Sequence, residues 1–485
     1  MKKSDALPLL LVIVAGAALF AWRLTGPTNL MDNDQERPAA YVLDALRNGH
    51  WICQMDWMGG VSSKPPLHTW LAALATLPFD RINVFSLYLP SALAVIVTAV
   101  LILRAGSAFF GAGAGLLGAL MFLLSPLTVR QIALARIDAL FAALVTGAAL
   151  AAFRCWNSGG KWTAFWLLSA LATLTKGPLG LLIAAAGLLA VRWDGAGTRP
   201  APARGSLLPG LALFLLLTLG WFSLACAQMG PAVADRLFRA ELIGHATVGD
   251  KGGLPLVQFY KPVLYFLGRF APWSLATLAG LWSVFSRAAA DPPARRFERF
   301  TVCWFVAGLV IFALAPHQRP DHLSPILPAA ALLAGRSANR WLGRVRPAAQ
   351  PLVILAVAAA MAAAIGRYDH ERRDALVVRR SVGMETVAGA IREQAGDGLP
   401  LLHVDTPFTL QFHLDTMQTL TPGAKAARRL TGTEPVYVAA CDLRHVTRWL
   451  PRGTRWYELV RWPTEGEAFV HLITNRPGFP EKPAR

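Results

Sequence analysis

The feature that most constrains this chain is a series of apolar segments of roughly membrane-spanning length. Hydropathy and the punctuation by Pro, Gly and Arg predict about eleven of them. Only 16% of the 485 residues are charged, whereas about a quarter is usual in soluble domains, and the mean hydropathy is +0.43. The chain is therefore predicted to be a polytopic α-helical membrane protein. The predicted spans are residues 7–24, 84–103, 108–126, 137–153, 162–175, 177–191, 207–228, 259–285, 301–315, 323–339 and 350–366.

Orientation explains the net charge of +18 better than nucleic acid binding does. Lys and Arg concentrate in cytoplasmic loops. With a cytoplasmic N-terminus and an odd number of spans, most of the excess falls on the predicted cytoplasmic ends, and residues 25–83 and 229–258 become long outward loops. We therefore expect a multi-pass protein of a bacterial inner membrane, with membrane lipids and no nucleic acid among its partners.

The composition changes after residue 366. Residues 1–366 hold the predicted spans, whereas residues 367–485 have an ordinary soluble composition. Strand-like runs at 399–404, 435–440 and 468–474 alternate with helical stretches at 382–394 and 442–450. The sequence thus predicts a transmembrane domain followed by a small soluble α/β domain on the outer side.

The first outward loop begins with acids and ends with a cation. Asp34 and Glu36 follow the first span, and Lys64 precedes two prolines. Taken alone, each acid is better explained by a solvated loop in which Asp34 caps a helix that Pro38 helps to begin. The rigid turn after Lys64 holds a cation near the membrane surface, where a lipid phosphate lies.

Further charges stand at the mouths of apolar helices. Ionisable residues at membrane depth are costly and are functional by default, which favours Asp138 as a site residue. The alternative for Asp138 is a surface ion pair with Arg136, which would contribute little. Lys176 lies between two short apolar spans, with snorkelling to lipid headgroups as its alternative.

Two further patterns give weaker candidates for site residues. Glu241 and His245 are spaced i, i+4 and could bind a metal or move a proton, although such a pair alone identifies neither. Arg319 lies in a cationic run at 317–322, on the same predicted side. The five cysteines form no CxxC pair, so the sequence contains no readable zinc ribbon or redox motif.

Taken in order, several motifs carry a resemblance that covers roughly residues 5–340. The chain resembles the aminoarabinose transferases and related members of the protein O-mannosyltransferase superfamily, which are polytopic GT-C glycosyltransferases that use polyprenyl-phosphate sugars. The matching motifs are Asp34 through Trp70 with Gly49-His50-Trp51 and Lys64-Pro65-Pro66-Leu67, Ala135-Arg136-Ile137-Asp138-Ala139, Thr175-Lys176-Gly177-Pro178, 241–245, Phe270-Ala271-Pro272-Trp273-Ser274 and 319–328.

The resemblance implies roles for individual residues. Asp34 matches the first acid of an Asp-Glu motif that acts near the acceptor, and Asp138 matches a second acid in the cavity. Lys64 matches a lysine that binds the lipid-linked phosphate. His245 matches approximately a histidine of a metal site, with Glu241 as a further candidate ligand.

The chain departs from the family pattern at two positions. Gln35 replaces the Glu of the motif, which leaves Asp34, helped by Glu36, as the matched carboxylate. Ser63 stands where an acid commonly precedes the lysine in the family. The chain therefore lacks the metal ligand that this acid would supply. No cofactor is therefore assigned, and a divalent metal is left open.

The implied activity is transfer of a hexosyl or pentosyl group, with inversion, from a polyprenyl-phosphate sugar to an envelope acceptor: lipid A, another glycan or a protein. Asp34 would act as general base towards a hydroxyl acceptor. The predicted substrate-binding residues are Glu36, Arg37, Lys64, Arg136, Lys176, His245 and Arg319. The alternatives are a transporter or flippase of lipid-linked sugar, and a noncatalytic assembly protein.

Overall fold

The computed structural model describes residues 6–31, 34–194, 207–237, 258–315, 317–373, 375–395, 401–463 and 469–476. Its contacts divide the chain into two compact units. The first unit consists of Met1–Gly26, Ser62–Ala75 and Val84–His370, and the second consists of Pro27–Val61, Thr76–Asn83 and Glu371–Arg485. Each unit is described below by itself.

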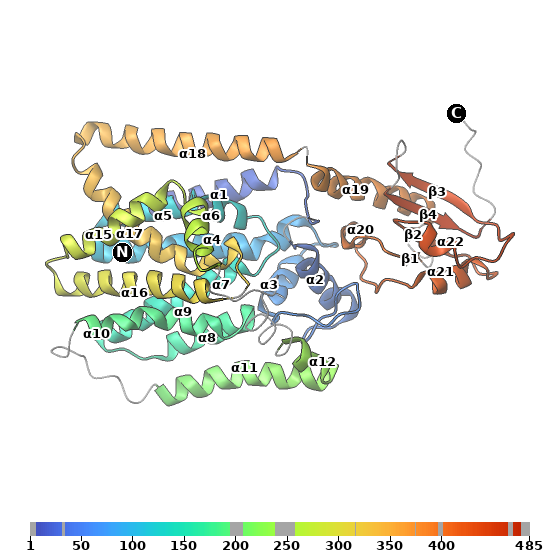
Figure 1. Ribbon diagram of the computed structural model, residues 1–485, viewed down its shortest axis with the longest axis horizontal. Coiled ribbons are helices and arrows are strands. Elements are labelled where there is room, and N and C mark those ends of the chain that lie inside the picture. Colours follow the sequence, from blue (N-terminus) through green and yellow to red (C-terminus); the bar gives the residue numbers. More distant parts are fainter. Residues whose placement is uncertain are drawn as a thin grey trace. The chain divides into compact units, whose positions relative to one another are not determined.

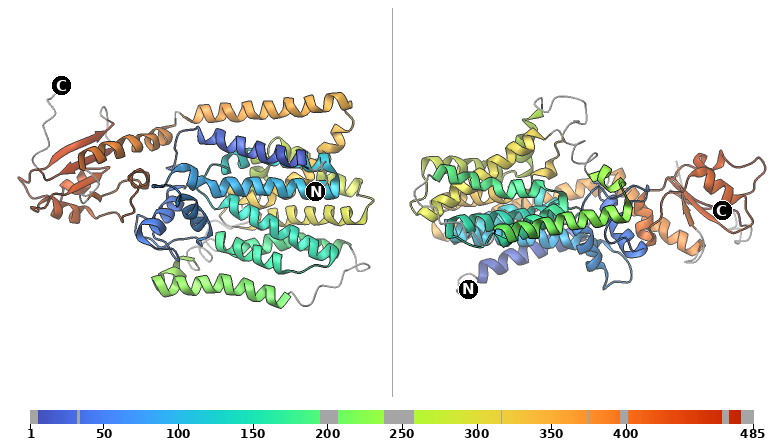
Figure 2. Two further views of the ribbon diagram at one scale, coloured as in Figure 1. Left: turned by 180° about the vertical axis from the view of Figure 1, so that it is seen from behind. Right: turned by 90° about the horizontal axis from the view of Figure 1, so that it is seen from below.

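The first unit is a bundle of helices (Figure 1), and the longest of them run side by side in all three views (Figure 2). Its α-helices are α1 (Ala6–Leu24), α3 (Leu67–Thr76), α4 (Val84–Phe110), α5 (Ala112–Leu123), α6 (Pro126–Gln131), α7 (Asp138–Ser158), α8 (Thr163–Lys176), α9 (Leu179–Ala186), α10 (Ala190–Asp194), α11 (Leu207–Met229), α12 (Ala232–Ala234), α14 (Lys261–Arg269), α15 (Trp273–Ser286), α16 (Pro292–Leu314), α17 (Leu327–Leu342) and α18 (Gln350–Arg373). In the described part of the unit, the 3₁₀ helices η2 (Gly187–Leu189), η7 (Pro320–Ile326) and η8 (Pro347–Ala349) join them.

Each of the predicted spans coincides with one helix or with consecutive short helices. Within the described residues, six helices are long and apolar enough to cross a membrane. The predicted span 259–285 is divided into α14 and α15 at Phe270–Pro272, where the peptide bond between Ala271 and Pro272 is cis. The structure thus confirms the polytopic helical fold class.

Glycines allow close helix packing in the centre of this bundle. A Cβ on Gly106 of α4 would lie 2.6 Å from the Cα of Gly115 in α5. A Cβ on Gly335 of α17 would lie 2.3 Å from the carbonyl oxygen of Ala114. Small residues at such contacts let helix backbones approach closely inside a membrane. Any larger side chain at either glycine would push α5 away from its neighbours.

The second unit is a four-stranded mixed sheet with helices. Its helices are α2 (Glu36–Asn48), α19 (Leu376–Ala395), α20 (Phe408–Leu414), α21 (Gly423–Leu430) and α22 (Arg444–Thr447), and its strands are β1 (Leu401–His403), β2 (Tyr437–Ala440), β3 (Tyr457–Trp462) and β4 (Val470–Thr474). The strand order is β1-β2-β4-β3, in which β1 and β2 are parallel and the other neighbours are antiparallel. Two apolar clusters fill the space between strands and helices, one around Met384 of α19 and one around Ala427 of α21.

The first outward loop does not stay with a single unit. Residues 25–83 were expected to belong to the transmembrane domain, but Pro27–Val61 and Thr76–Asn83 form part of the same compact unit as Glu371–Arg485. Ser62–Ala75, which includes Lys64, and the first two residues of the loop belong to the helical unit. The two candidate site residues of this loop, Asp34 and Lys64, therefore belong to different units.

Candidate active site

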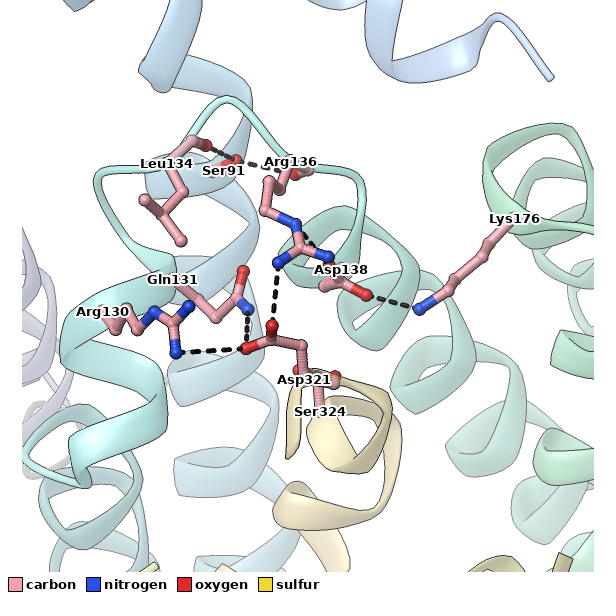
Figure 3. A network of polar contacts seen from close by, with 9 residues as sticks. All are labelled: Ser91, Arg130, Gln131, Leu134, Arg136, Asp138, Lys176, Asp321 and Ser324. Atoms are coloured by element: carbon pink, nitrogen blue, oxygen red, sulfur yellow. Dashed lines mark hydrogen bonds and ion pairs between the residues drawn. The ribbon is translucent and has the colours of Figure 1, made fainter. Parts of the chain in front are cut away.

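Charged side chains from separate parts of the helical unit lie close together (Figure 3). They lie at the end of α6 and the turn after it, at the first residue of α7, at the last residue of α8 and in η7. We call them the charged cluster, which consists of Arg130, Arg136, Asp138, Lys176 and Asp321.

Local sequence signals place these side chains. Ser125 caps α6, accepting a hydrogen bond from the backbone N–H of Thr128, and α8 ends at Gly177, whose φ of +101° suits glycine. The hydroxyl of Ser91 in α4 donates to the carbonyl oxygens of Leu134 at 2.7 Å and Arg136 at 3.1 Å. These bonds fix the turn that connects α6 to α7.

Asp138 is the centre of the cluster. Its residue is only 1% exposed, and it lies in the first turn of α7, where the helix dipole favours a negative charge. Lys176 donates to Oδ1 of Asp138, and Nε of Arg136 lies 3.2 Å from Oδ2. Two cations therefore compensate one buried carboxylate, as a desolvated charge requires.

Asp321 extends the network from η7. Its Oδ2 accepts a hydrogen bond from Arg136 at 2.8 Å, and its Oδ1 accepts one from Nε2 of Gln131 at 3.0 Å. Arg130 lies 3.9 Å from the same Oδ1. The cluster thus contains three cations and two carboxylates, which leaves an excess of positive charge.

Two buried histidines lie in the electrostatic field of Asp138. Burial lowers the pKa of His68, in α3, to about 4, against the opposing effect of Asp138. Burial, followed by the charge of Lys176, also lowers the pKa of His322 in η7. Both imidazoles are therefore neutral near pH 7.

The sequence had placed Arg136, Asp138 and Lys176 in the site, and the structure brings these three side chains together. Sequence reasoning missed Asp321 and His68 as site residues. Their available signals were an acid within the cationic run 317–322 and a histidine directly after Lys64-Pro65-Pro66-Leu67.

The other predicted site residues in the described part of the helical unit are Lys64 and Arg319. Lys64 is half-buried in the helical unit, in a turn where the hydroxyl of Ser62 donates to the Lys64 carbonyl at 2.7 Å. Arg319 is exposed and directly precedes η7. Glu241 and His245 lie outside the described residues.

In the second unit, Asp34 is exposed and has a φ of +55° directly before α2. The neighbouring Gln35 is buried, and its amide donates to the carbonyl oxygen of Asn29 at 2.6 Å. A carboxylate cannot donate this bond, which gives a local reason for Gln at the position where the family has Glu.

Glu36 and Arg37 face partners of their own unit. One carboxylate oxygen of Glu36 accepts hydrogen bonds from the backbone N–H and the hydroxyl of Thr409, both at 2.9 Å. Burial raises the pKa of Glu36, and these bonds oppose the shift. Arg37 lies 3.7 Å from the buried Asp56.

Among the described residues, no group of three or more His, Cys, Asp or Glu side chains is arranged to hold a metal ion. The carboxylate of Asp138 is instead engaged by Lys176 and Arg136. The metal candidates Glu241 and His245 lie in the part of the chain that is not described, so they stay a prediction.

The chain is similar to known glycosyltransferases in sequence and fold. Residues 63–223 match the dolichyl-phosphate-mannose-protein mannosyltransferase family. ArnT from Cupriavidus metallidurans bound to undecaprenyl phosphate superposes with a TM-score of 0.72 at 17% identity, over 96% of this chain and 98% of that one. The apo state of the same protein gives 0.69 at 17% identity, over 97% and 98%.

A more distant match is the archaeal oligosaccharyltransferase AglB from Archaeoglobus fulgidus, in complex with an inhibitory peptide and a dolichol-phosphate. Its TM-score is 0.50 at 11% identity, over 93% of this chain and 71% of that one. No curated protein sequence matches the chain.

The chain is therefore a polytopic helical protein that has the fold of ArnT and, over residues 63–223, is similar in sequence to a mannosyltransferase family. The resemblance expected from the sequence is thus confirmed as a likeness, in sequence to the mannosyltransferase family and in fold to the two ArnT structures.

Proposed function

We propose that this protein is a membrane glycosyltransferase that moves a hexosyl or pentosyl group from a polyprenyl-phosphate donor to an envelope acceptor. The observation that carries the proposal is the charged cluster, in which Arg130, Arg136 and Lys176 surround two carboxylates at one end of the helical unit. The excess positive charge suits a phosphate, and the similar ArnT was solved with undecaprenyl phosphate bound.

An apolar cavity supports a lipid-linked donor. It has a volume of about 450 Å³ and lies between α3, α4, α7 and α8. Every lining side chain is apolar, among them Leu71, Leu93 and Leu140. The cavity includes Leu140 in the first turn of α7, and its apolar lining suits an isoprenoid chain.

The chemistry follows from these groups. The acceptor oxygen attacks the anomeric carbon from the face opposite the phosphate, the bond from that carbon to the phosphate oxygen breaks, and the configuration inverts. Negative charge develops on the departing polyprenyl phosphate, where Lys64, Arg136, Lys176 and Arg319 stabilise it. Asp138, paired with Arg136 and Lys176, holds these two cations in place.

The acceptor decides what Asp34 does. A hydroxyl acceptor must lose its proton, and Asp34, with Glu36 beside it, takes that proton as general base. A phosphate acceptor, such as that of lipid A, is already anionic, and Asp34 then orients it. Arg37 contributes to substrate binding, and the proposal assigns no role to a metal.

Topology completes the proposal. The N-terminus lies in the cytoplasm of a bacterial cell, and transfer takes place on the periplasmic side of the inner membrane, where the C-terminal residues also lie. The excess of Lys and Arg at the alternate span ends supports this orientation.

Binding of undecaprenyl phosphate tests the donor site. In nanodiscs containing the full-length protein, we expect Lys64→Met to weaken binding by roughly tenfold, because one charge-assisted hydrogen bond to the phosphate is lost. Lys161→Met is the matched control. Lys161 lies in the loop before Thr163, at the opposite end of α8 from Lys176. Equal affinities of the wild type and Lys64→Met would contradict the donor site.

Acceptor class is tested by Asp34→Asn. We expect this variant to abolish transfer to a hydroxyl acceptor, because the amide cannot take the proton. The variant should retain transfer to a phosphate acceptor to within roughly tenfold, since no proton is removed there. Near-normal turnover of Asp34→Asn with a hydroxyl acceptor would refute the role as base.

A further inference from the structure

We propose that the C-terminal residues of the second unit position the loop that carries Asp34, with Thr409 and Ser381 as positioning residues. The inference rests on the proposed role of Asp34 at the acceptor. It gives the C-terminal part of the chain a task in the reaction, rather than that of a separate module.

Contacts to C-terminal residues lie on both sides of Asp34 in the sequence. Before it, the backbone N–H of the buried Leu30 donates to the hydroxyl of Ser381 in α19 at 3.2 Å. After it, Glu36 accepts both hydrogen bonds from Thr409, at the start of α20. Ser381 and Thr409 are both fully buried. The acid therefore lies in a short stretch whose two ends are held by the C-terminal residues.

The same association continues along the loop. Arg47, at the end of α2, forms an ion pair with Asp415, and Nδ2 of Asn48 donates to the carbonyl oxygen of Met417 at 3.3 Å. Further on, the backbone N–H of Leu420 donates to the carbonyl oxygen of Trp57 at 2.7 Å. The indole of Trp57 packs against Phe408, with ring centroids 5.4 Å apart. These contacts lie at both ends of α2 and in the segment after it, so this part of the loop is built into the second unit.

The backbone conformation of Asp34 indicates why the surrounding contacts have to hold this residue in position. Its φ of +55° is in the left-handed region, which non-glycine residues occupy only when the surrounding structure holds them there. A general base must also lie within hydrogen-bond reach of the proton that it removes. A displacement of about 1 Å reduces turnover by roughly 100-fold. Thr409, which anchors Glu36 two residues from Asp34, is well placed to prevent such a displacement.

The test uses the full-length protein and two measurements. Thr409→Val removes the hydroxyl donor and keeps the backbone N–H. We expect it to raise amide hydrogen exchange in peptides covering residues 30–42 by about tenfold, because one of the two bonds to Glu36 is lost. We expect turnover per folded enzyme to fall by about tenfold with a hydroxyl acceptor, while the affinity for undecaprenyl phosphate stays unchanged.

Two further variants separate positioning from folding. Thr409→Ser keeps the hydroxyl and should restore both exchange and turnover. Thr431→Val is the matched control, because its hydroxyl donates to the carbonyl oxygen of Arg428 on the exposed side of α21 and touches no residue of the loop. It should leave both measurements as in the wild type.

Each outcome decides the inference. Unchanged exchange over residues 30–42 in Thr409→Val would overturn the positioning role, whatever the activity. Raised exchange with unchanged turnover would overturn its importance for the reaction. A wild type that transfers no sugar would refute the proposed function instead, and the exchange measurement would still decide whether Thr409 holds the loop.

Discussion

At the scale of single residues, the buried carboxylates of the charged cluster are each paired with a cation. Asp138 is almost fully buried and contacts two cations, and one of these, Arg136, is shared with Asp321. Burial of an unpaired carboxylate would be strongly unfavourable. The same pairing that stabilises Asp138 also presents Arg136 and Lys176 at the proposed phosphate site.

Removing one partner should therefore reduce both stability and activity. We expect Lys176→Met to lower the free energy of unfolding by about 3 kcal/mol, because it leaves Asp138 with Arg136 alone. The double variant Asp138→Asn with Lys176→Met should regain most of that stability without regaining activity. Thermal unfolding in detergent and sugar transfer measure the two effects, and a fully active double variant would contradict the assignment.

Sequence alone predicted candidate site residues among the charges of the helical unit, but it did not predict all of their partners. Asp138 and Lys176 stood out because each interrupts an apolar stretch. Asp321 did not, because it lies among other polar residues and its contact with Arg136 spans 185 positions. Long-range pairing of this kind depends on how the helices pack, which hydropathy does not report.

At the scale of elements, hydropathy and alternation predicted most of the architecture. The strand-like runs 399–404, 435–440 and 468–474 correspond to β1, β2 and β4, and the helical stretch 382–394 lies within α19. β3 was missed, because Tyr457–Trp462 carries charged side chains and none of its residues is buried at the edge of the sheet. An edge strand needs little apolar surface, so its sequence signal is weak.

The buried end of β1 makes the second unit sensitive to acid. Burial lowers the pKa of His403 to about 4, whereas an unfolded histidine has a pKa of about 6.5. Between these values the unfolded state binds a proton that the folded state does not, so stability is complete above pH 6.5 and falls as the pH drops towards 4. The loss should reach about 3 kcal/mol below pH 4.

His403→Asn removes this titration and keeps a polar side chain. The variant should be less stable than the wild type at pH 7, because the smaller side chain leaves a gap. Its thermal midpoint should nevertheless decline less between pH 7 and pH 4.5. Parallel pH curves for the two proteins would show that His403 does not cause the sensitivity.

At the scale of the whole molecule, the chain combines a helical unit with a unit that contains both the first loop and the C-terminal residues. The composition of the sequence changes after residue 366, and the second unit resumes at Glu371. It could not show that Pro27–Val61 folds with them, because that association depends on contacts such as Glu36 with Thr409, far apart in the sequence. Asp34 belongs to the second unit, whereas Lys64, Asp138 and Lys176 belong to the helical unit.

The most direct test is a transfer assay with the full-length protein in sealed vesicles. The vesicles contain undecaprenyl phosphate carrying a labelled sugar, together with envelope lipids as acceptors. We predict that the label moves to an acceptor while an equal amount of undecaprenyl phosphate is released, and that Asp138→Asn does neither. Movement of the intact labelled donor across the bilayer, with no release of undecaprenyl phosphate, would contradict the transferase and identify a flippase.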